Sequence, residues 1–165
     1  MIVVSNATPL IALAKLGHFA LLQKLFTEVT ISQEVWTEVV TQGAGRPGAA
    51  ETSQAAWIRV VPLAQPALLP IWRSAYNLGA GETSTILLAK ELSATLALID
   101  ERQARNLALK EGIAISGSIA VLESGYRQGH LSDLRQVYAQ LLAANLYIAK
   151  HKLNQSLASF NLPPL

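Results

Sequence analysis

Two acidic residues in the middle of this sequence are spaced so that they could do chemistry together. Glu82 and Asp100 stand 18 residues apart. A helix over 81–92 would rise roughly 18 Å at ~1.5 Å per residue, and a strand over 95–99 would return roughly 17 Å at ~3.3 Å per residue. The chain would therefore go out along a helix and come back along a strand. This predicts that both carboxylates reach the same edge of a sheet.

Such an edge is where open α/β folds build their sites, and oxygen ligands there suit a hard divalent cation. Each acid also has a simpler interpretation. Glu82 is typical of a first helical turn, where the helix dipole favours negative charge. Asp100 is typical of an N-cap for the helix that follows it. Because both fall together on one edge, we favour a metal site over two separate structural roles.

Asn6 and Thr8 fall in the same kind of place, after the first strand. The apolar run 1–4 reads as a buried strand. Thr8 followed by Pro9 predicts that Thr8 is an N-cap and Pro9 the first helical position, and the helix then continues over 10–16. Asn6 therefore lies just past the strand's carboxyl end. A turn residue that tolerates unusual dihedral angles is the alternative interpretation.

Ser118 is a fourth polar residue of this kind, because it follows a short strand over 113–115. An N-cap for the helix that runs to about Gly129 is the simpler role, and the two roles are compatible. Ser116 shares the segment.

Two glutamates lie on a helix predicted over 33–40, which Ser32 caps. Glu34 and Glu38 are four residues apart, so they share one helix face. Either could point at the carboxyl edge, and solvated surface glutamates are the alternative. The sequence leaves the choice between them open.

Basic residues follow Asp100 directly. Arg102 and Arg105 are three apart on the helix that runs to about Gly112, beside the proposed acidic edge, where they could hold a phosphate. Ordinary surface pairing with glutamate is the alternative, above all for Arg105. Arg46 lies in a glycine-rich loop over 42–51, where we expect it to be solvated.

Composition bounds the kind of protein. The chain has 165 residues, of which 51% are hydrophobic and 15% are charged, so we expect one folded domain over 1–165 and no disorder. There are no cysteines, no apolar run of the ~18 residues that a membrane helix needs, and no basic region before the first apolar run. We therefore expect a cytoplasmic protein outside the membrane. The net charge of +2 does not by itself indicate a nucleic-acid-binding protein.

The order of elements predicts a three-layer α/β/α sandwich around a central parallel sheet. The segment 57–62 reads as an edge strand limited by Pro62, and 63–78 as proline-punctuated chain. Helices over 133–144, capped by Ser132, and 149–160 should pack on this sandwich.

With these pieces in place, the chain resembles the PIN-domain family, and more closely its VapC-type, toxin-like members. The matching stretches are VVSNATPLIALAKLG at 3–17, ISQEVWTEVV at 31–40, LGAGETSTILLAKEL at 78–92, LALIDERQARNLALKEGI at 96–113 and SGSIAVLESGYRQGHL at 116–131. The similarity runs from residue 1 to about residue 131, and the order of the pieces is more specific than any one of them.

The resemblance implies a metal-dependent ribonuclease that uses Mg²⁺ or Mn²⁺ and cuts RNA. It also implies the toxin of a toxin–antitoxin pair, with an antitoxin protein as partner, and a homodimer. The family's four acidic positions fall on Asn6, Glu38, Glu82 and Asp100, and its hydroxyl positions on Thr8 and on Ser118 or Ser116. Arg102 and Arg105 would contact substrate phosphates.

Asn6 departs from that pattern, because the family's usual residue there is aspartate. An amide oxygen can bind a hard cation but brings no charge. Two other functions therefore stay open. One is a PIN-like module that binds RNA or a protein without cutting. The other is a small-nucleotide site at the Gly79-Ala80-Gly81 turn, which lacks the third glycine of the usual fingerprint.

Overall fold

A parallel sheet forms the middle of the molecule. The structure is a computed structural model that describes residues 1–146 and 148–165. Its five strands run in the order β3-β2-β1-β4-β5, and every pair is parallel. The strands are β1 (Val3–Ser5), β2 (Val29–Ser32), β3 (Ile58–Val61), β4 (Leu96–Leu98) and β5 (Ile115–Ser116). The order confirms the expected edge strand, since β3 is outermost.

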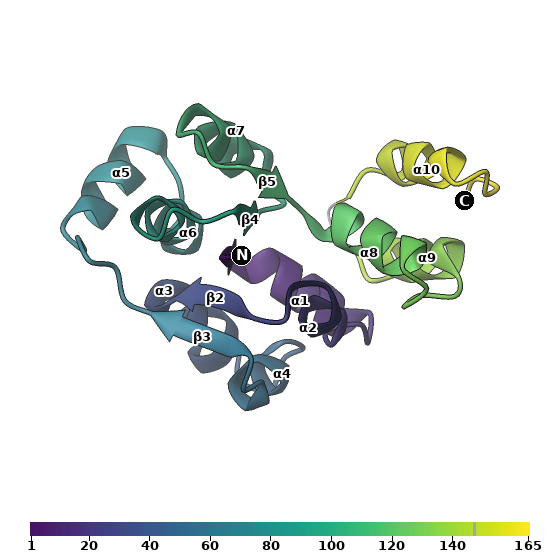
Figure 1. Cartoon of the computed structure of the whole chain (residues 1–165), viewed down its shortest axis with the longest axis horizontal. Helices are drawn as coiled ribbons and strands as arrows, with labels where there is room; N and C mark the ends of the chain where they lie inside the picture. The colour runs from purple at the N-terminus through teal and green to yellow at the C-terminus, as the bar shows by residue number, and fades with distance from the viewer. Residues whose placement is uncertain (147) are drawn as a thin grey trace.

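Helices cover both faces of this sheet, which confirms the three-layer α/β/α sandwich (Figure 1). Those before β4 are α1 (Ala7–Lys15), α2 (Leu21–Phe26), α3 (Gln33–Trp36), η1 (Thr37–Thr41, a π-helix), α4 (Ala49–Gln54), α5 (Leu68–Tyr76) and α6 (Ala80–Glu91). Those after it are α7 (Arg102–Lys110), α8 (Ser118–Arg127), α9 (Leu134–Ala143) and α10 (Lys150–Ser159).

Alternation along the strands divides the core in two. Val3 and Leu98 face one cluster, which α1, α2, α8, α9 and α10 complete, whereas Val4, Ala97 and Ile99 face another with α6 and α7. Successive side chains of a strand point to opposite faces, so strands of this kind must be apolar on both. This explains why 96–99 is a continuous apolar run.

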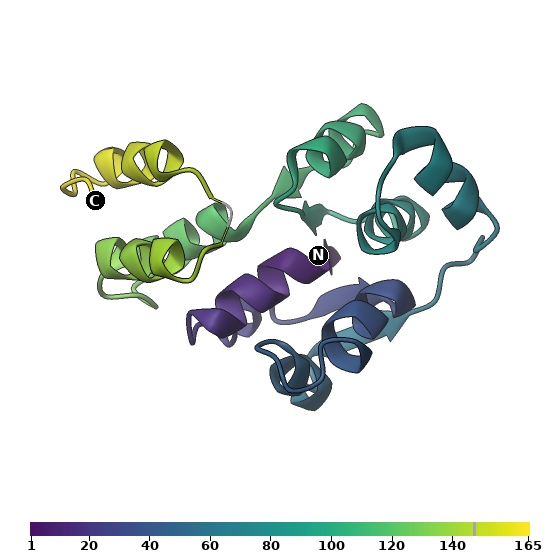
Figure 2. The ribbon, with the colours of Figure 1, turned by 180° about the vertical axis from the view of Figure 1, so that it is seen from behind.

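The last three helices gather at one end of the molecule, and α5 lies at the other, in both views (Figures 1 and 2). Tyr138 on α9 is fully buried and its hydroxyl is 2.7 Å from Ser156 Oγ on α10. Ser156 Oγ donates in turn to Glu123 Oε1 on α8 at 2.5 Å, so the tyrosine must be the donor to the serine. Burial raises the pKa of Tyr138 to about 12. This chain of hydrogen bonds fixes α10 against α8.

Several predicted boundaries were wrong, for local reasons. The first helix begins at Ala7 with Asn6 as its N-cap, and not at Leu10 after Thr8, because a proline fits anywhere in a first turn, where no partner is needed for its nitrogen. Asp133, and not Ser132, caps α9, since its side chain accepts from Gln136 N. The segment 63–78, predicted as proline-punctuated chain, contains the helix α5. The predicted loop over 42–51 is shorter than expected, because α4 begins at Ala49.

The serine–tyrosine contact predicts a stability effect. Tyr138→Phe removes one buried hydrogen bond while Ser156 keeps Glu123 as acceptor, so we expect a loss of about 1 kcal/mol in the free energy of unfolding. Urea denaturation followed by circular dichroism measures it. Tyr126→Phe is the control, because that hydroxyl has no partner in the described part of the chain. Equal losses in the two variants would contradict the contact's role.

Candidate active site at the carboxyl edge of the sheet

The β1–β4 pair positions the candidate site. Asn6 N donates to Leu98 O at 3.0 Å, which continues the ladder one residue past β1. Asn6 and Asp100 consequently end side by side at one edge, at the place where the strand order turns from β1 toward β4. Ligands in open α/β sheets bind at such switch points. The geometric prediction from the sequence put the site at this edge.

Asn6 is 2% exposed and does not cap its helix with its side chain. Its Nδ2 donates to Glu101 Oε2 at 3.1 Å, and Thr8 Oγ1 donates to Glu101 Oε1. Because an ionised carboxylate can only accept hydrogen bonds, Glu101 determines which end of the Asn6 amide faces it. The amide oxygen is thereby turned the other way.

That oxygen, Asn6 Oδ1, is buried and has no hydrogen-bond partner among the described residues. It faces Glu38 across Gly81. Glu38 Oε2 and Asn6 Oδ1 lie 2.5 Å and 3.1 Å from the point where a Cβ on Gly81 would stand. Two oxygen acceptors thus face one small space that any larger residue at position 81 would fill.

Glu38 projects from the π-helix η1, which follows α3 directly. By surface area its side chain is exposed, yet its carboxylate faces protein at Gly81. Partial burial, and then the negative charges of Glu82 and Glu101, raise the pKa of Glu38 above its ordinary value of 4.5. Glu34 and Glu38 both line a cavity of about 420 Å³ at the start of α6, and Glu34 Oε2 is buried without a partner in the described chain. Both glutamates therefore border this cavity, as the shared helix face predicts.

Glu82 keeps its structural role in this structure. Its Oε2 accepts from Gly79 N at 2.7 Å, which closes the first turn of α6. It also lines the cavity with Glu34 and Glu38. Three glutamates in front of the Gly79-Ala80-Gly81 turn, and one of them bonded to its first N–H, make an environment that disfavours a phosphate. The arrangement of these glutamates therefore does not support a small-nucleotide site at this turn.

Asp100 is held by the start of α8. Ser118 N donates to its Oδ1 at 2.7 Å, and Ser118 Oγ donates to its Oδ2 at 2.6 Å. Burial raises the pKa of Asp100, and the two bonds from Ser118 act against that rise. Neither residue has the cap role that the simpler interpretations gave it, since Glu101 is the N-cap of α7 and Gly117 that of α8.

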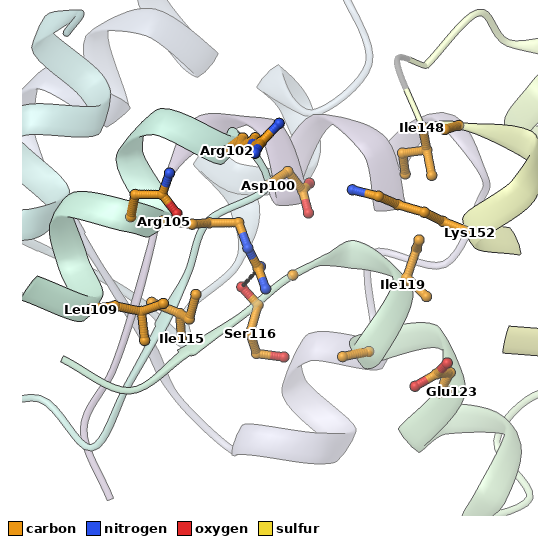
Figure 3. Close-up of a pocket in the computed structure, with 14 residues that line it drawn as sticks. Asp100, Arg102, Arg105, Leu109, Ile115, Ser116, Ile119, Glu123, Ile148 and Lys152 are labelled. Atoms are coloured by element: carbon orange, nitrogen blue, oxygen red, sulfur yellow. Dashed lines mark hydrogen bonds between the residues drawn. The ribbon is translucent and has the colours of Figure 1, made fainter. Parts of the chain in front are cut away.

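The two arginines differ. Arg105 Nη1 donates to Ile99 O at 2.8 Å and to Ser116 O at 3.1 Å, so it ties the ends of β4 and β5 together. Arg102 is exposed. Both line a second cavity next to Asp100 (Figure 3). Arg105 is thus engaged with the sheet backbone through its side chain, whereas Arg102 has no such bond in the described part of the chain.

Glu101 belongs to the site although no pattern in the sequence singles it out. It stands beside Asp100 and reads as one more surface glutamate of a helix start. Only its partners reveal it, because Asn6 and Thr8 are more than 90 positions away along the chain. No local pattern signals such a contact.

The atoms at this edge that could bind a metal ion are carboxylate, amide and hydroxyl oxygens, a set of ligands that suits Mg²⁺ or Mn²⁺. The unpartnered Asn6 Oδ1 opposite Glu38 fits a cation between them. Over residues 1–146 and 148–165, however, no three acidic or histidine side chains converge as a complete ligand set. Glu82 would have to give up its hydrogen bond to Gly79 N to join Asn6 and Glu38.

Comparison with known families identifies the family of this chain. A family model described as a PIN domain matches residues 2–162, nearly the whole chain. The chain belongs to the PIN-domain family, whose fold is of the nuclease type. No curated protein matches it. In the described residues, no helix has the length and apolar character needed to cross a membrane.

The raised pKa of Glu38 predicts a pH effect on stability. Between its ordinary pKa of 4.5 and the raised value, the folded protein binds more protons than the unfolded chain, so this group's contribution to stability falls as pH rises. We expect Glu38→Gln, in chelator, to melt above the wild type at about pH 7 and close to it at about pH 4. Thermal melts of both proteins, with the exposed Glu28→Gln as control, measure this difference. A lower melting temperature at neutral pH would show that the fold stabilises the charged form.

The Glu101 contacts predict an effect on metal binding. In Glu101→Gln one of the two donors, Asn6 Nδ2 or Thr8 Oγ1, would face an amide NH₂. The amide of Asn6 would lose its fixed orientation, and we expect Mn²⁺ affinity to fall by about tenfold or more, as for other partners of ligands. Calorimetric titration with Mn²⁺ alone tests it. Glu28→Gln removes one exposed negative charge elsewhere and should bind like the wild type.

Proposed function

We propose that this PIN-domain protein is a metal-dependent endoribonuclease, which hydrolyses phosphodiester bonds of RNA. The observation that carries the proposal is the buried, unpartnered Asn6 Oδ1 facing the Glu38 carboxylate. Two acceptors in one partly buried space repel each other unless a proton or a cation lies between them. The neighbouring charges of Glu82 and Glu101 favour a divalent cation in that space.

Asn6, Glu38, Glu82 and Asp100 are the residues that would hold Mg²⁺ or Mn²⁺. An ion held there would supply neutralisation of charge on the phosphoryl oxygens, and it would lower the pKa of a water so that hydroxide is available as the nucleophile. The chain's own residues arrange the rest. Glu101 turns the Asn6 oxygen toward the ion's space and brings a negative charge beside the neutral amide, in place of the charge that an aspartate would carry.

Hydroxyls and basic side chains complete the proposed site. Ser118 holds both oxygens of Asp100, so the orientation of that acid does not depend on the ion. Thr8 donates to Oε1 of Glu101 and Asn6 to its Oε2, so this acid is held at both oxygens as well. Arg102 is free to contact a substrate phosphate, and Arg105 places its charge nearby while it holds the strand ends.

The family resemblance supports a proposal about the protein's cellular location, assembly and partner. We place the protein in the cytoplasm, as the toxin of a toxin–antitoxin pair, acting as a homodimer of single-domain chains with an antitoxin protein as partner. Light scattering of the purified protein, alone and co-expressed with the product of the neighbouring reading frame, tests the assembly. A monomer that binds no such product would remove this part and leave the nuclease proposal standing.

A second candidate function has one observation in its favour. In the described residues Glu82 and Asp100 already have hydrogen-bond partners, and no three acids converge. This would suit a PIN-like module that binds RNA or a protein partner without cutting. It differs from the first candidate in showing binding with no metal-dependent cleavage.

Removal of the Asp100 charge separates the two functions. We expect the wild type to cleave members of an RNA panel, including transfer RNA, with Mn²⁺ or Mg²⁺ and not with chelator, and Asp100→Asn to lose at least about 100-fold in rate because a proposed ion ligand is gone. Denaturing gels and circular dichroism give rate and folding. Full activity in the variant would refute the site, and a folded wild type that never cuts would favour the binding module.

A further inference from the structure

A cavity of about 480 Å³ opens next to Asp100, on the side of α7, β5 and α10. We call it the α7–α10 pocket. Its volume falls in the range of small-molecule sites, roughly 300–1,000 Å³, and is too small for a helix of a partner protein. The residues that matter below are Arg102, Asn106, Ile115, Ser116, Ile119 and Lys152.

The pocket is continuous with the candidate active site, because Asp100 and Gly117 line it. Figure 3 shows the Lys152 side chain reaching from α10 toward Asp100, with Arg102 on α7 close to the same acid. A group bound in this pocket would therefore lie directly beside the proposed point of cleavage. It would touch a helix from the far end of the chain.

Charge on the pocket wall favours an anion. Arg102 and Lys152 are exposed and form no ion pair within the part of the chain that the structure describes. Glu123, on the opposite wall, already accepts a hydrogen bond from Ser156. Two unpaired cations thus flank the acidic edge, where attraction to a polyanion would otherwise be weak.

The remaining wall is apolar and suits a flat ring. Ile115 on β5 and Ile119 on α8 line it, with Asn106 and Ser116 beside them. A base could pack its face on the isoleucines while its phosphate reaches the cations. A pocket of this size with apolar and cationic walls matches one nucleotide of a single strand.

We propose that the α7–α10 pocket binds the nucleotide of single-stranded RNA adjacent to the cleaved bond, with Arg102 and Lys152 on its phosphate and Ile115 and Ile119 on its base. The identity of the ligand rests on the proposed ribonuclease function. The contribution of α10 is the new element. The C-terminal helix, fixed by the Tyr138–Ser156–Glu123 hydrogen bonds, becomes part of the substrate site.

The test measures RNA binding apart from cleavage. Affinity for a short labelled single-stranded RNA is followed by fluorescence anisotropy in chelator, over a range of salt concentrations. We expect Lys152→Ala and Arg102→Ala each to weaken binding roughly fivefold, and to lower the slope of log affinity against log salt by about 0.7, the value for one lost phosphate contact on a single strand. Lys150→Ala is the matched control, because it removes the same charge from an exposed position of α10 that does not line the pocket.

Three outcomes would overturn the proposal. Equal losses in Lys150→Ala and Lys152→Ala would mean general attraction to positive charge. Unchanged affinity in Lys152→Ala would leave the pocket without this role. So would a wild type that binds no RNA in chelator. Metal-dependent cleavage of the same RNA by the wild type is scored separately, so failure of the pocket and failure of the nuclease proposal are distinguished.

Discussion

The hydrogen bond from Asn6 N to Leu98 O is the constraint on which the candidate site depends. It extends the pairing of β1 and β4 beyond the strand ends, and so fixes the two chain segments that carry Asn6, Asp100 and Glu101. Side chains that are 95 positions apart in sequence thereby come within hydrogen-bond distance. A shift of β1 by one residue in this register would turn the Asn6 side chain to the opposite face of the sheet.

Space at the site depends on two glycines. Gly81 leaves room for the Glu38 and Asn6 oxygens, and a Cβ on Gly117 would stand 2.6 Å from Asp100 Oδ1. Both glycines are buried at the start of a helix. The acids can therefore approach the helix backbone, where N–H groups without helical partners offset part of their charge. Ser118 N, bonded to Asp100, is an example.

Charge is arranged in opposite ways on the two sides of this edge. On the α6 side, Glu34, Glu38 and Glu82 border one cavity, and their mutual repulsion would be relieved by a cation. On the α7 side, Arg102 and Lys152 border another cavity that would suit an anion. An ion and a phosphate chain meeting at Asp100 would satisfy both. This arrangement links the proposed chemistry and the proposed binding of substrate.

Much of the framework could be predicted from local pattern. The apolar strands and the helix between Glu82 and Asp100 are each encoded by neighbouring residues, and the family resemblance placed them in order. Local reasoning failed where a contact overrode it. The helix over 33–40 divides into α3 and the π-helix η1, and α5 forms in proline-punctuated chain because Leu68, Leu69 and Trp72 pack on the second core.

Sequence by itself determined that oxygen-bearing residues stand at the carboxyl ends of strands, because strand and helix lengths set where each segment ends. Only the tertiary structure decided which of them face one another. The orientation of the Asn6 amide depends on Glu101, and the environment of Glu38 depends on Gly81. Lys152 lines a pocket with Asp100 only because α10 packs on α8. These are contacts between distant segments, and the free energy that selects them arises from packing of the whole core.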